Sequence, residues 1–252
     1  TGTPSRAGVT HDFYWNNKRP QQAIATLKQA SSEANQELSR TFLLEAATKS
    51  NQSGDYAGAR SVLAPLLAAD PYNPRYLATQ ADSYALAKDD AGLRDFYTTK
   101  LTALKTANLS AETRRDKTAL LRQGLIVALT HMKDYDGATS QYIALISTFP
   151  EDPDIAQNAA LYALQYSRQQ QLTAFLNKTV TDSPRDSRFA ILLARIDTLF
   201  EDYPAALTAY GKAIAIRKDR PDLYIARADL EEHQQNFDAA CDDYDRLYLL
   251  TY

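Results

Sequence analysis

Gly54-Asp55-Tyr56-Ala57-Gly58-Ala59 is the stretch of this sequence that decides the fold, because it recurs along the chain. The pattern of Asp or Asn, an aromatic residue, two further residues and then Ala returns within residues 133–138, 201–206 and 235–240. The closing alanines Ala206 and Ala240 are separated by about 34 residues, which is the period of a helix-turn-helix repeat. Ala138 lies two such steps before Ala206.

Two weaker copies complete the series. One repeat step from Ala59 reaches Leu93 within residues 88–93, and the same step from Ala138 reaches Leu172 within residues 167–172. Prolines follow the same period, since Pro74, Pro153 and Pro221 each precede a helical pattern. Proline is tolerated in the first turn of a helix, where its missing amide hydrogen would have no partner inside the helix. The sequence therefore predicts two amphipathic helices in each repeat.

Composition limits the classes of function. The 252 residues carry a net charge of −3, and no cluster of Lys and Arg stands apart from acidic residues, so we expect no nucleic-acid partner. No apolar stretch is long enough to cross a bilayer, so we expect a soluble chain without membrane insertion. The sequence starts without methionine, which leaves its location open between the cytoplasm and export after removal of an N-terminal signal.

Nothing in the sequence predicts a catalytic site or a metal site. The single cysteine, Cys241, excludes an intrachain disulfide and a site made of several cysteines. The histidines His11, His131 and His233 are about a hundred residues apart, and none has a second ligand at metal spacing. We therefore expect no catalytic residue, no metal and no cofactor, and the chain is predicted not to be an enzyme.

The pattern resembles the tetratricopeptide repeat family. The family's small and aromatic positions are matched most fully by Ala194, Tyr203, Ala206, Tyr210 and Ala213, and by Ala228, Phe237, Ala240 and Tyr244. The resemblance implies an all-α fold, an α-solenoid of antiparallel helix pairs that winds as a right-handed superhelix. The chain departs from the family in lacking its Trp-Leu-Gly start, and in having Leu125, Ile126 and Leu172 where small residues are expected.

The expected organisation is a flexible segment over residues 1–10 followed by a solenoid over residues 11–252. The solenoid divides into a partial unit at 11–39 and repeats at about 40–73, 74–118, 119–152, 153–186, 187–220 and 221–252. The second repeat is 11 residues too long, and the excess falls within residues 100–117. Ser110 is a plausible N-cap for the helix that follows. The insertion is either an extended corner or a dedicated binding loop.

The resemblance also implies a binding groove, since the first helix of each repeat lines the concave surface in this family. By that register the groove candidates are Arg75, Asp82, His131, Gln157, Asn158, Gln165, Arg188, Arg195, Thr198, Asp229, Glu232 and His233. The lysine, arginine and asparagine clamp of chaperone-binding members is not matched, so we expect a scaffold or adaptor that binds an extended peptide or a helix of a protein partner. Several tyrosines fall on packing positions of the repeat, and Tyr14, Tyr72 and Tyr76 are left as candidates for the surface.

An alternative is a structural or oligomerising repeat segment of a larger protein. Residues 221–252 contain eight acidic residues against Arg227 and Arg246, a net charge of −6. The last helix is apolar and lacks the polar face that closes most repeat arrays. Self-association through this C-terminal helix is therefore a further expectation.

Overall fold

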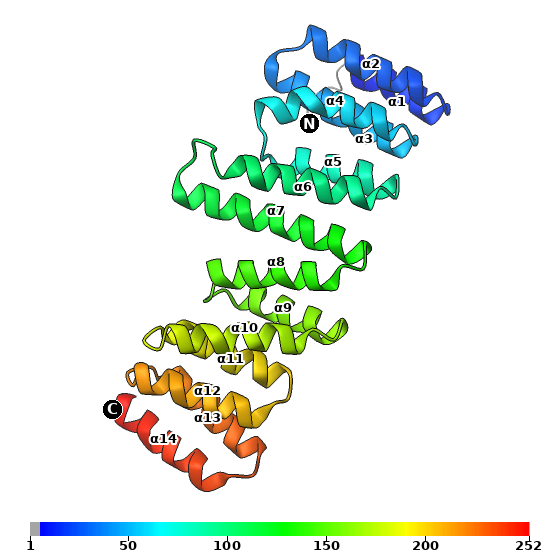
Figure 1. Ribbon diagram of the computed structural model, residues 1–252. Helices are drawn as coiled ribbons and strands as arrows, with labels where there is room; N and C mark the ends of the chain where they lie inside the picture. Colours follow the sequence, from blue (N-terminus) through cyan, green and yellow to red (C-terminus); the bar gives the residue numbers. More distant parts are fainter. Residues whose placement is uncertain (1–5, 252) are drawn as a thin grey trace. The chain divides into compact units, whose positions relative to one another are not determined.

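The computed structural model describes residues 6–251, and over this range it contains helices and no strands (Figure 1). This confirms the all-α fold of antiparallel helix pairs. The helices are α1 (Arg6–Asn16), α2 (Pro20–Glu33), α3 (Gln36–Gln52), α4 (Tyr56–Ala69), α5 (Pro74–Leu86), α6 (Asp90–Leu104), α7 (Ala111–His131), α8 (Tyr135–Thr148), α9 (Pro153–Gln165), α10 (Gln169–Asp182), α11 (Ser187–Leu199), α12 (Tyr203–Ile216), α13 (Pro221–His233) and α14 (Phe237–Thr251).

The chain forms two compact units, which divide in sequence between Met132 and Lys133. Unit 1 contains α1 to α7, and unit 2 contains α8 to α14. The division falls within the repeat predicted over residues 119–152. Of the segment predicted to be flexible, residues 6–10 form the first part of α1, and residues 1–5 lie outside the described residues.

Each helical hairpin turns at one residue in the left-handed backbone conformation. The φ angle is +85° at Gly54 and +56° to +61° at Lys18, Lys88, Lys133, Ser167, Glu201 and Gln235. From Gly54 onward these positions recur with the period of the sequence repeat, except for the longer step from Lys88 to Lys133. At the α5–α6 turn, Lys88 N donates to Ala85 O at 3.0 Å and Asp89 N donates to Tyr84 O at 2.9 Å, which pairs the last free carbonyls of α5.

The recurring aspartate caps the second helix of four hairpins, namely α4, α6, α8 and α12. The carboxylates of Asp55, Asp89 and Asp134 each accept a hydrogen bond from the backbone N–H of a glycine three residues later, at 2.8–2.9 Å. A Cβ atom on those glycines would lie 2.0–2.4 Å from the carboxylate. Asp202 caps onto Ala205 instead, and there the hydrogen bond lengthens to 3.3 Å. Glycine in the repeat therefore makes room for the capping side chain.

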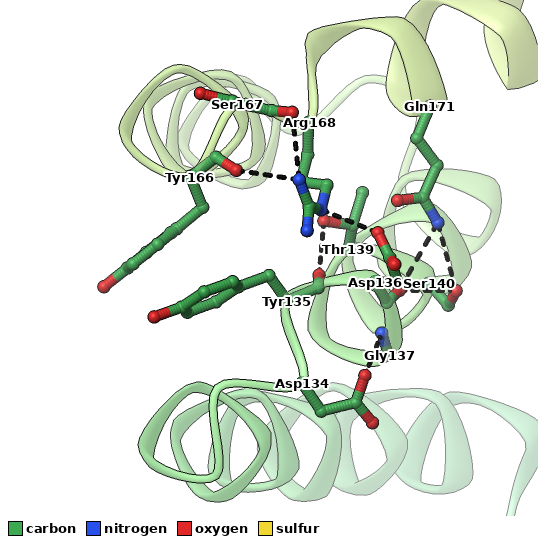
Figure 2. A network of polar contacts seen from close by, with 10 residues as sticks. All are labelled: Asp134, Tyr135, Asp136, Gly137, Thr139, Ser140, Tyr166, Ser167, Arg168 and Gln171. Atoms are coloured by element: carbon green, nitrogen blue, oxygen red, sulfur yellow. Dashed lines mark hydrogen bonds and ion pairs between the residues drawn. The ribbon is translucent and has the colours of Figure 1, made fainter.

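The weak copy at residues 167–172 replaces this cap with a different network (Figure 2). Arg168 occupies the N-cap position of α10 and makes no capping hydrogen bond. Its guanidinium forms an ion pair with Asp136 of α8 at 2.6 Å and donates to the carbonyl oxygens of Tyr166 and Ser167 at 3.1 and 3.2 Å. Gln171 donates to the carbonyl of Asp136 at 3.3 Å. These contacts tie α10 to α8 where the aspartate is absent.

The insertion lengthens α7 and the loop before it. The elements around the insertion are compared with those of the next hairpins. α7 has 21 residues where α9 has 13, and α6 is one residue longer than α8. The loop at 105–110 is two residues longer than the loop at 149–152. Together these account for the 11 extra residues. The predicted Ser110 cap is confirmed, since its hydroxyl accepts from Thr113 N at 3.1 Å. Arg114 donates to Ala107 O at 2.7 Å, which fixes the loop to α7.

Close packing of α6 and α7 characterises unit 1. A Cβ atom on Gly124 of α7 would lie 2.1 Å from the Tyr97 ring of α6, so the helix backbone rests directly on that ring. The leucine that replaces the small residue in the third clear copy, Leu125, is buried beside it.

Tyr72 and Tyr76 are each only 8% exposed, so the prediction that they lie on the surface is wrong. Both rings belong to the core instead.

α11 is the central helix of unit 2. It packs against α9, α10 and α12, and eight of its thirteen residues are buried. Neighbouring helices therefore cover much of its surface. Arg195 is exposed and Thr198 is half-buried, and both lie on the part of α11 that remains open. The helix that anchors the core of unit 2 therefore also supplies its accessible polar groups.

Candidate functional site

A cavity of about 620 Å³ lies between the first helices of two successive hairpins, α9 and α11. We call it the α9–α11 cavity. It is lined by Glu151, Pro153, Ala156, Gln157, Arg195, Thr198, Leu199 and Tyr210. Apolar groups from Pro153, Ala156 and Leu199 are combined with a few polar groups from both helices. This mixture is typical of a site that buries an apolar side chain and orients it by hydrogen bonds.

The structure brings three of the predicted groove residues together here, namely Gln157, Arg195 and Thr198. Gln157 extends from α9 with both an amide donor and a carbonyl acceptor. Arg195 makes no ion pair with any described residue, so its guanidinium is available to a ligand. The hydroxyl of Thr198 donates to the carbonyl of Ala194 at 2.7 Å, which leaves its oxygen as an acceptor.

Tyr210 adds a neutral phenol to the cavity. Burial raises the pKa of Tyr210, and the nearby carboxylates of Asp222 and Asp229 act in the same direction, while Arg195 and Thr198 oppose the shift. The phenol therefore keeps its proton at neutral pH. The sequence used Tyr210 only as a packing residue of the family pattern, and it is in fact both buried and part of the cavity wall.

Arg188 lies in an adjoining cavity of about 610 Å³ at the ends of the same hairpins. Glu151 lines both cavities, so they share a boundary. Arg188 is held by Asp186, with Nε donating to Oδ1 at 2.9 Å and Nη2 to Oδ2 at 2.7 Å. Arg217 and Arg220 line this second cavity and are paired in the same way with Asp219 and Asp222. Their charges are therefore largely balanced.

Unit 1 has a related cavity of about 480 Å³ between α3 and α5. It contains Arg75, which the sequence predicted, and Glu37, Arg40 and Thr41 of α3, which it did not place in the groove. The missed residues lie on the first helix of the hairpin that begins at Gln36, four residues before the start predicted for that repeat. The earlier start moves Glu37 onto the helix.

The remaining predicted residues are exposed but lie outside these cavities. They are Asp82, His131, Asn158, Gln165, Asp229, Glu232 and His233. Some contact the second helix of the preceding hairpin: His131 Nδ1 lies 3.1 Å from Asp90 Oδ1 of α6, and the His233 ring packs against Tyr203 of α12 with centroids 4.9 Å apart. The register predicted exposure on the first helices correctly, but it did not predict which exposed residues share a cavity.

α11 also carries one buried carboxyl group that does not line the α9–α11 cavity. Asp197 precedes Thr198 on α11 and is only 3% exposed. Burial raises its pKa to about 7, and the charge of Asp202 adds to the shift. Among residues 6–251, no three His, Cys, Asp or Glu side chains are grouped so that they could hold a metal ion. Asp197 is thus an isolated buried acid in the helix that carries Arg195.

None of the helices between residues 6 and 251 has the length and apolar character needed to cross a bilayer. No protein-family model matches the sequence, and no curated protein sequence matches it.

Several solved structures are similar to the chain. A tetratricopeptide repeat protein from Parabacteroides merdae is 14% identical, with 98% of this chain and 92% of that chain covered and a TM-score of 0.42. The TPR2AB domain of yeast Sti1 in complex with pHSP90 is 16% identical, with 96% and 88% covered and a TM-score of 0.36. MamA from Desulfovibrio magneticus is 12% identical, with 70% and 94% covered and a TM-score of 0.37. The repeat character of this chain is seen in its own hairpin turns, which recur with the period of the sequence pattern.

Proposed function

We propose that this tetratricopeptide-like helical repeat chain is a non-catalytic protein-interaction scaffold, and that it binds an extended peptide in the α9–α11 cavity. The observation that carries the proposal is Arg195, an exposed guanidinium that forms no ion pair within residues 6–251 and lines the same cavity as the apolar Ala156 and Leu199. An arginine in such a place can donate to backbone carbonyls or to a carboxylate of a bound segment.

The chemistry of the wall indicates the kind of segment. A side-chain amide at Gln157 can pair with both the N–H and the C=O of an extended backbone. The floor of the cavity accepts one apolar side chain, and Leu199, which is 41% exposed, would lose contact with water on binding. An extended peptide with one apolar residue next to backbone groups free to pair satisfies both features.

The test begins with selection of binding peptides from a random library displayed on phage, using the 252-residue chain as the target. The affinity of the selected peptide is then compared between the unmodified chain, Gln157→Ala, Arg195→Ala and Asn158→Ala. Asn158 is the matched control, because it is exposed on α9 next to Gln157 but does not line the cavity.

We expect Arg195→Ala and Gln157→Ala each to weaken binding by about 5- to 30-fold, the effect of losing one or two hydrogen bonds worth about 1–2 kcal/mol. Asn158→Ala should change the affinity by less than about twofold. Equal losses of affinity in all three variants, or no loss in Arg195→Ala and Gln157→Ala, would show that the peptide binds outside this cavity.

A further inference from the structure

The cavity of about 610 Å³ that adjoins the α9–α11 cavity is lined by arginines that the peptide-binding proposal does not use. Two come from the start of α11 and the connection before it, and two from the connection between α12 and α13. They are Arg185, Arg188, Arg217 and Arg220. The acidic residues of the same wall are Glu151 and Asp186. We call this space the arginine cavity.

Three of these guanidinium groups are held in the same way by a carboxylate two residues away in the sequence. In each case Nε and Nη2 donate to the two carboxylate oxygens, at 2.5–3.2 Å. The pairs are Arg188 with Asp186, Arg217 with Asp219, and Arg220 with Asp222. The hydrogen bonds from arginine lower the pKa of all three carboxyl groups, so the pairs persist at neutral pH. Two-point pairs of this kind fix the orientation of the guanidinium plane.

Each pair leaves part of the guanidinium available to a ligand. A guanidinium has five N–H donors, and the pair uses one from Nε and one from Nη2. The second N–H of Nη2 and one N–H of Nη1 then form a further fork on the adjacent edge. Within residues 6–251, Nη1 of Arg188, Arg217 and Arg220 donates to no other residue. These arginines can therefore bind a second anion while they keep the first.

Arg185 differs from the other three because it has no carboxylate partner. It is exposed and forms no ion pair within residues 6–251. It lies one repeat period after Glu151 and one before Asp219, so a position that is acidic in both neighbouring hairpins is basic here. Ser187, at the start of α11, lines the same cavity. The first N–H groups of a helix have no partner inside it, so the start of α11 adds donors and the positive end of the helix dipole.

The balance of charge indicates how an anion would be recognised. Four arginines against Glu151 and Asp186 give the wall a net charge of +2. Asp219 and Asp222 do not line the cavity, but with them the region is neutral. Attraction from a distance is therefore weak, and binding depends on hydrogen bonds made inside the cavity. One arginine fork satisfies the two oxygens of a carboxylate, whereas a phosphate monoester presents three oxygens and about two charges.

We propose that the arginine cavity binds the dianion of a phosphate monoester. Forks from two or more of the four arginines meet on its three terminal oxygens, and the start of α11 supplies a further N–H donor. The ion pairs with Asp186, Asp219 and Asp222 stay intact, because the ligand uses the edges of the guanidinium groups that these carboxylates leave open. The volume of the cavity exceeds that of a phosphate group, so it also admits part of the molecule that carries the phosphate.

Glu151 opposes this ligand, and its effect provides a test with the opposite sign. Hydrogen bonds to Asp186 and Asp222 raise the pKa of Arg188 and Arg220, and the charge of Glu151 adds a smaller shift to both. The Glu151 carboxylate therefore acts on guanidinium groups that the phosphate would bind. Removing its charge should strengthen binding, whereas removing an arginine should weaken it.

The test is a titration of the 252-residue chain with glycerol 1-phosphate and with a capped tripeptide that contains phosphoserine, followed by calorimetry. At about pH 7.5 both ligands are dianions, since the second pKa of a phosphate monoester is about 6. Arg185→Ala is compared with Arg246→Ala, which removes another exposed arginine of unit 2 that does not line the cavity. Circular dichroism checks that each variant is folded.

We expect Arg185→Ala to weaken binding of both ligands by about 5- to 10-fold, the effect of losing a charge-assisted hydrogen bond at an exposed site. Arg246→Ala should change the affinity by less than about twofold. Glu151→Gln should strengthen binding by about 3- to 10-fold at low salt, because a negative charge near the ligand is removed. Equal affinity for the two ligands would assign the site to the phosphate group alone, and tighter binding of the tripeptide would assign it to a phosphorylated protein segment.

The proposal is overturned if neither ligand binds at about 10 mM, a concentration that would reveal a dissociation constant in the millimolar range. It is also overturned if Arg185→Ala and Arg246→Ala lose affinity equally, if Glu151→Gln weakens binding, or if acetate binds as tightly as glycerol 1-phosphate. Each of these results can be distinguished from failure of the peptide-binding proposal, because neither Arg195 nor Gln157 is altered and the selected peptide is not used.

Discussion

Replacing Asp197 with Asn should make the stability of unit 2 less dependent on pH. In the folded chain, burial raises the pKa of Asp197 from 3.8 to about 7, with Asp202 contributing. The native state therefore retains a proton that the unfolded state releases between these pH values. Because the native state binds more protons over that range, the free energy of unfolding falls as the pH rises from about 4 to 7 and is level above it.

The size of the effect follows from the shift. A difference of about three pKa units at about 1.4 kcal/mol per unit gives a loss of up to about 4 kcal/mol between pH 4 and pH 8. A side-chain amide does not ionise, so Asp197→Asn removes this component. The variant should gain on the unmodified chain as the pH rises, and the gap should approach about 4 kcal/mol at pH 8.

The assay is urea unfolding at several pH values, followed by far-ultraviolet circular dichroism. That signal reports the helices of both units, whereas the only tryptophan, Trp15, lies in α1 of unit 1. Asp202→Asn keeps a capping acceptor for Ala205 and removes the neighbouring charge, so it should reduce the pH dependence only in part. Asp245→Asn, at an exposed position on α14, is the control for a lost charge.

Parallel curves of unfolding free energy against pH for the unmodified chain and Asp197→Asn would refute this reasoning. They would mean that water or a neighbouring group solvates the carboxylate in the folded state. A gap that grows as the pH falls would reverse the sign and refute it equally.

Three further predictions concern packing, turns and the polar network, and each is checked by urea unfolding. Gly124→Ala should destabilise unit 1 by about 1–3 kcal/mol, because the added methyl group would clash with the Tyr97 ring. Gly211→Ala, whose Cβ atom would be 3.7 Å from Arg227, should instead stabilise unit 2 by up to about 1 kcal/mol. Equal changes in unfolding free energy for the two variants would contradict this. Glu201→Gly should stabilise the chain by about 0.5–1 kcal/mol, since Glu201 has a φ of +60°, a conformation that glycine adopts more easily. Gly54→Ala should destabilise the chain by about 1 kcal/mol for the same reason. A loss of stability in Glu201→Gly would mean that the left-handed backbone is not strained at this turn. Arg168→Ala should lower the free energy of unfolding by about 1–2 kcal/mol, because it removes the ion pair and the carbonyl contacts of Arg168. Arg185→Ala, in the loop before α11, is the control and should change the stability little. Similar effects for the two variants would mean that the contacts of Arg168 do not stabilise the fold.

The periodicity of the sequence was sufficient to predict the fold. Ala59, Ala138, Ala206 and Ala240 set the period of the repeat, and the left-handed turn residues follow the same steps. This works because a hairpin turn imposes the same backbone geometry wherever it occurs. The pattern did not reveal the reason for glycine three residues after Asp55, Asp89 and Asp134, which is the space that the capping carboxylate needs.

The sequence was less informative about the site. It placed the groove candidates on the first helices, and among them Gln157, Arg195 and Thr198 do share a cavity. It could not tell these from Asn158, because the register fixes the direction of a side chain but not the neighbours it meets on another helix. Tyr210 was missed for a related reason, since a residue assigned to packing can also form a cavity wall.

Photo-crosslinking of the selected peptide would show directly where on the chain it binds. A benzophenone replaces its apolar residue, and mass spectrometry locates the attachment point on the 252-residue chain. We expect crosslinks to Ala156 and Leu199, which line the α9–α11 cavity. Crosslinks confined to other helices, such as α14, would contradict it.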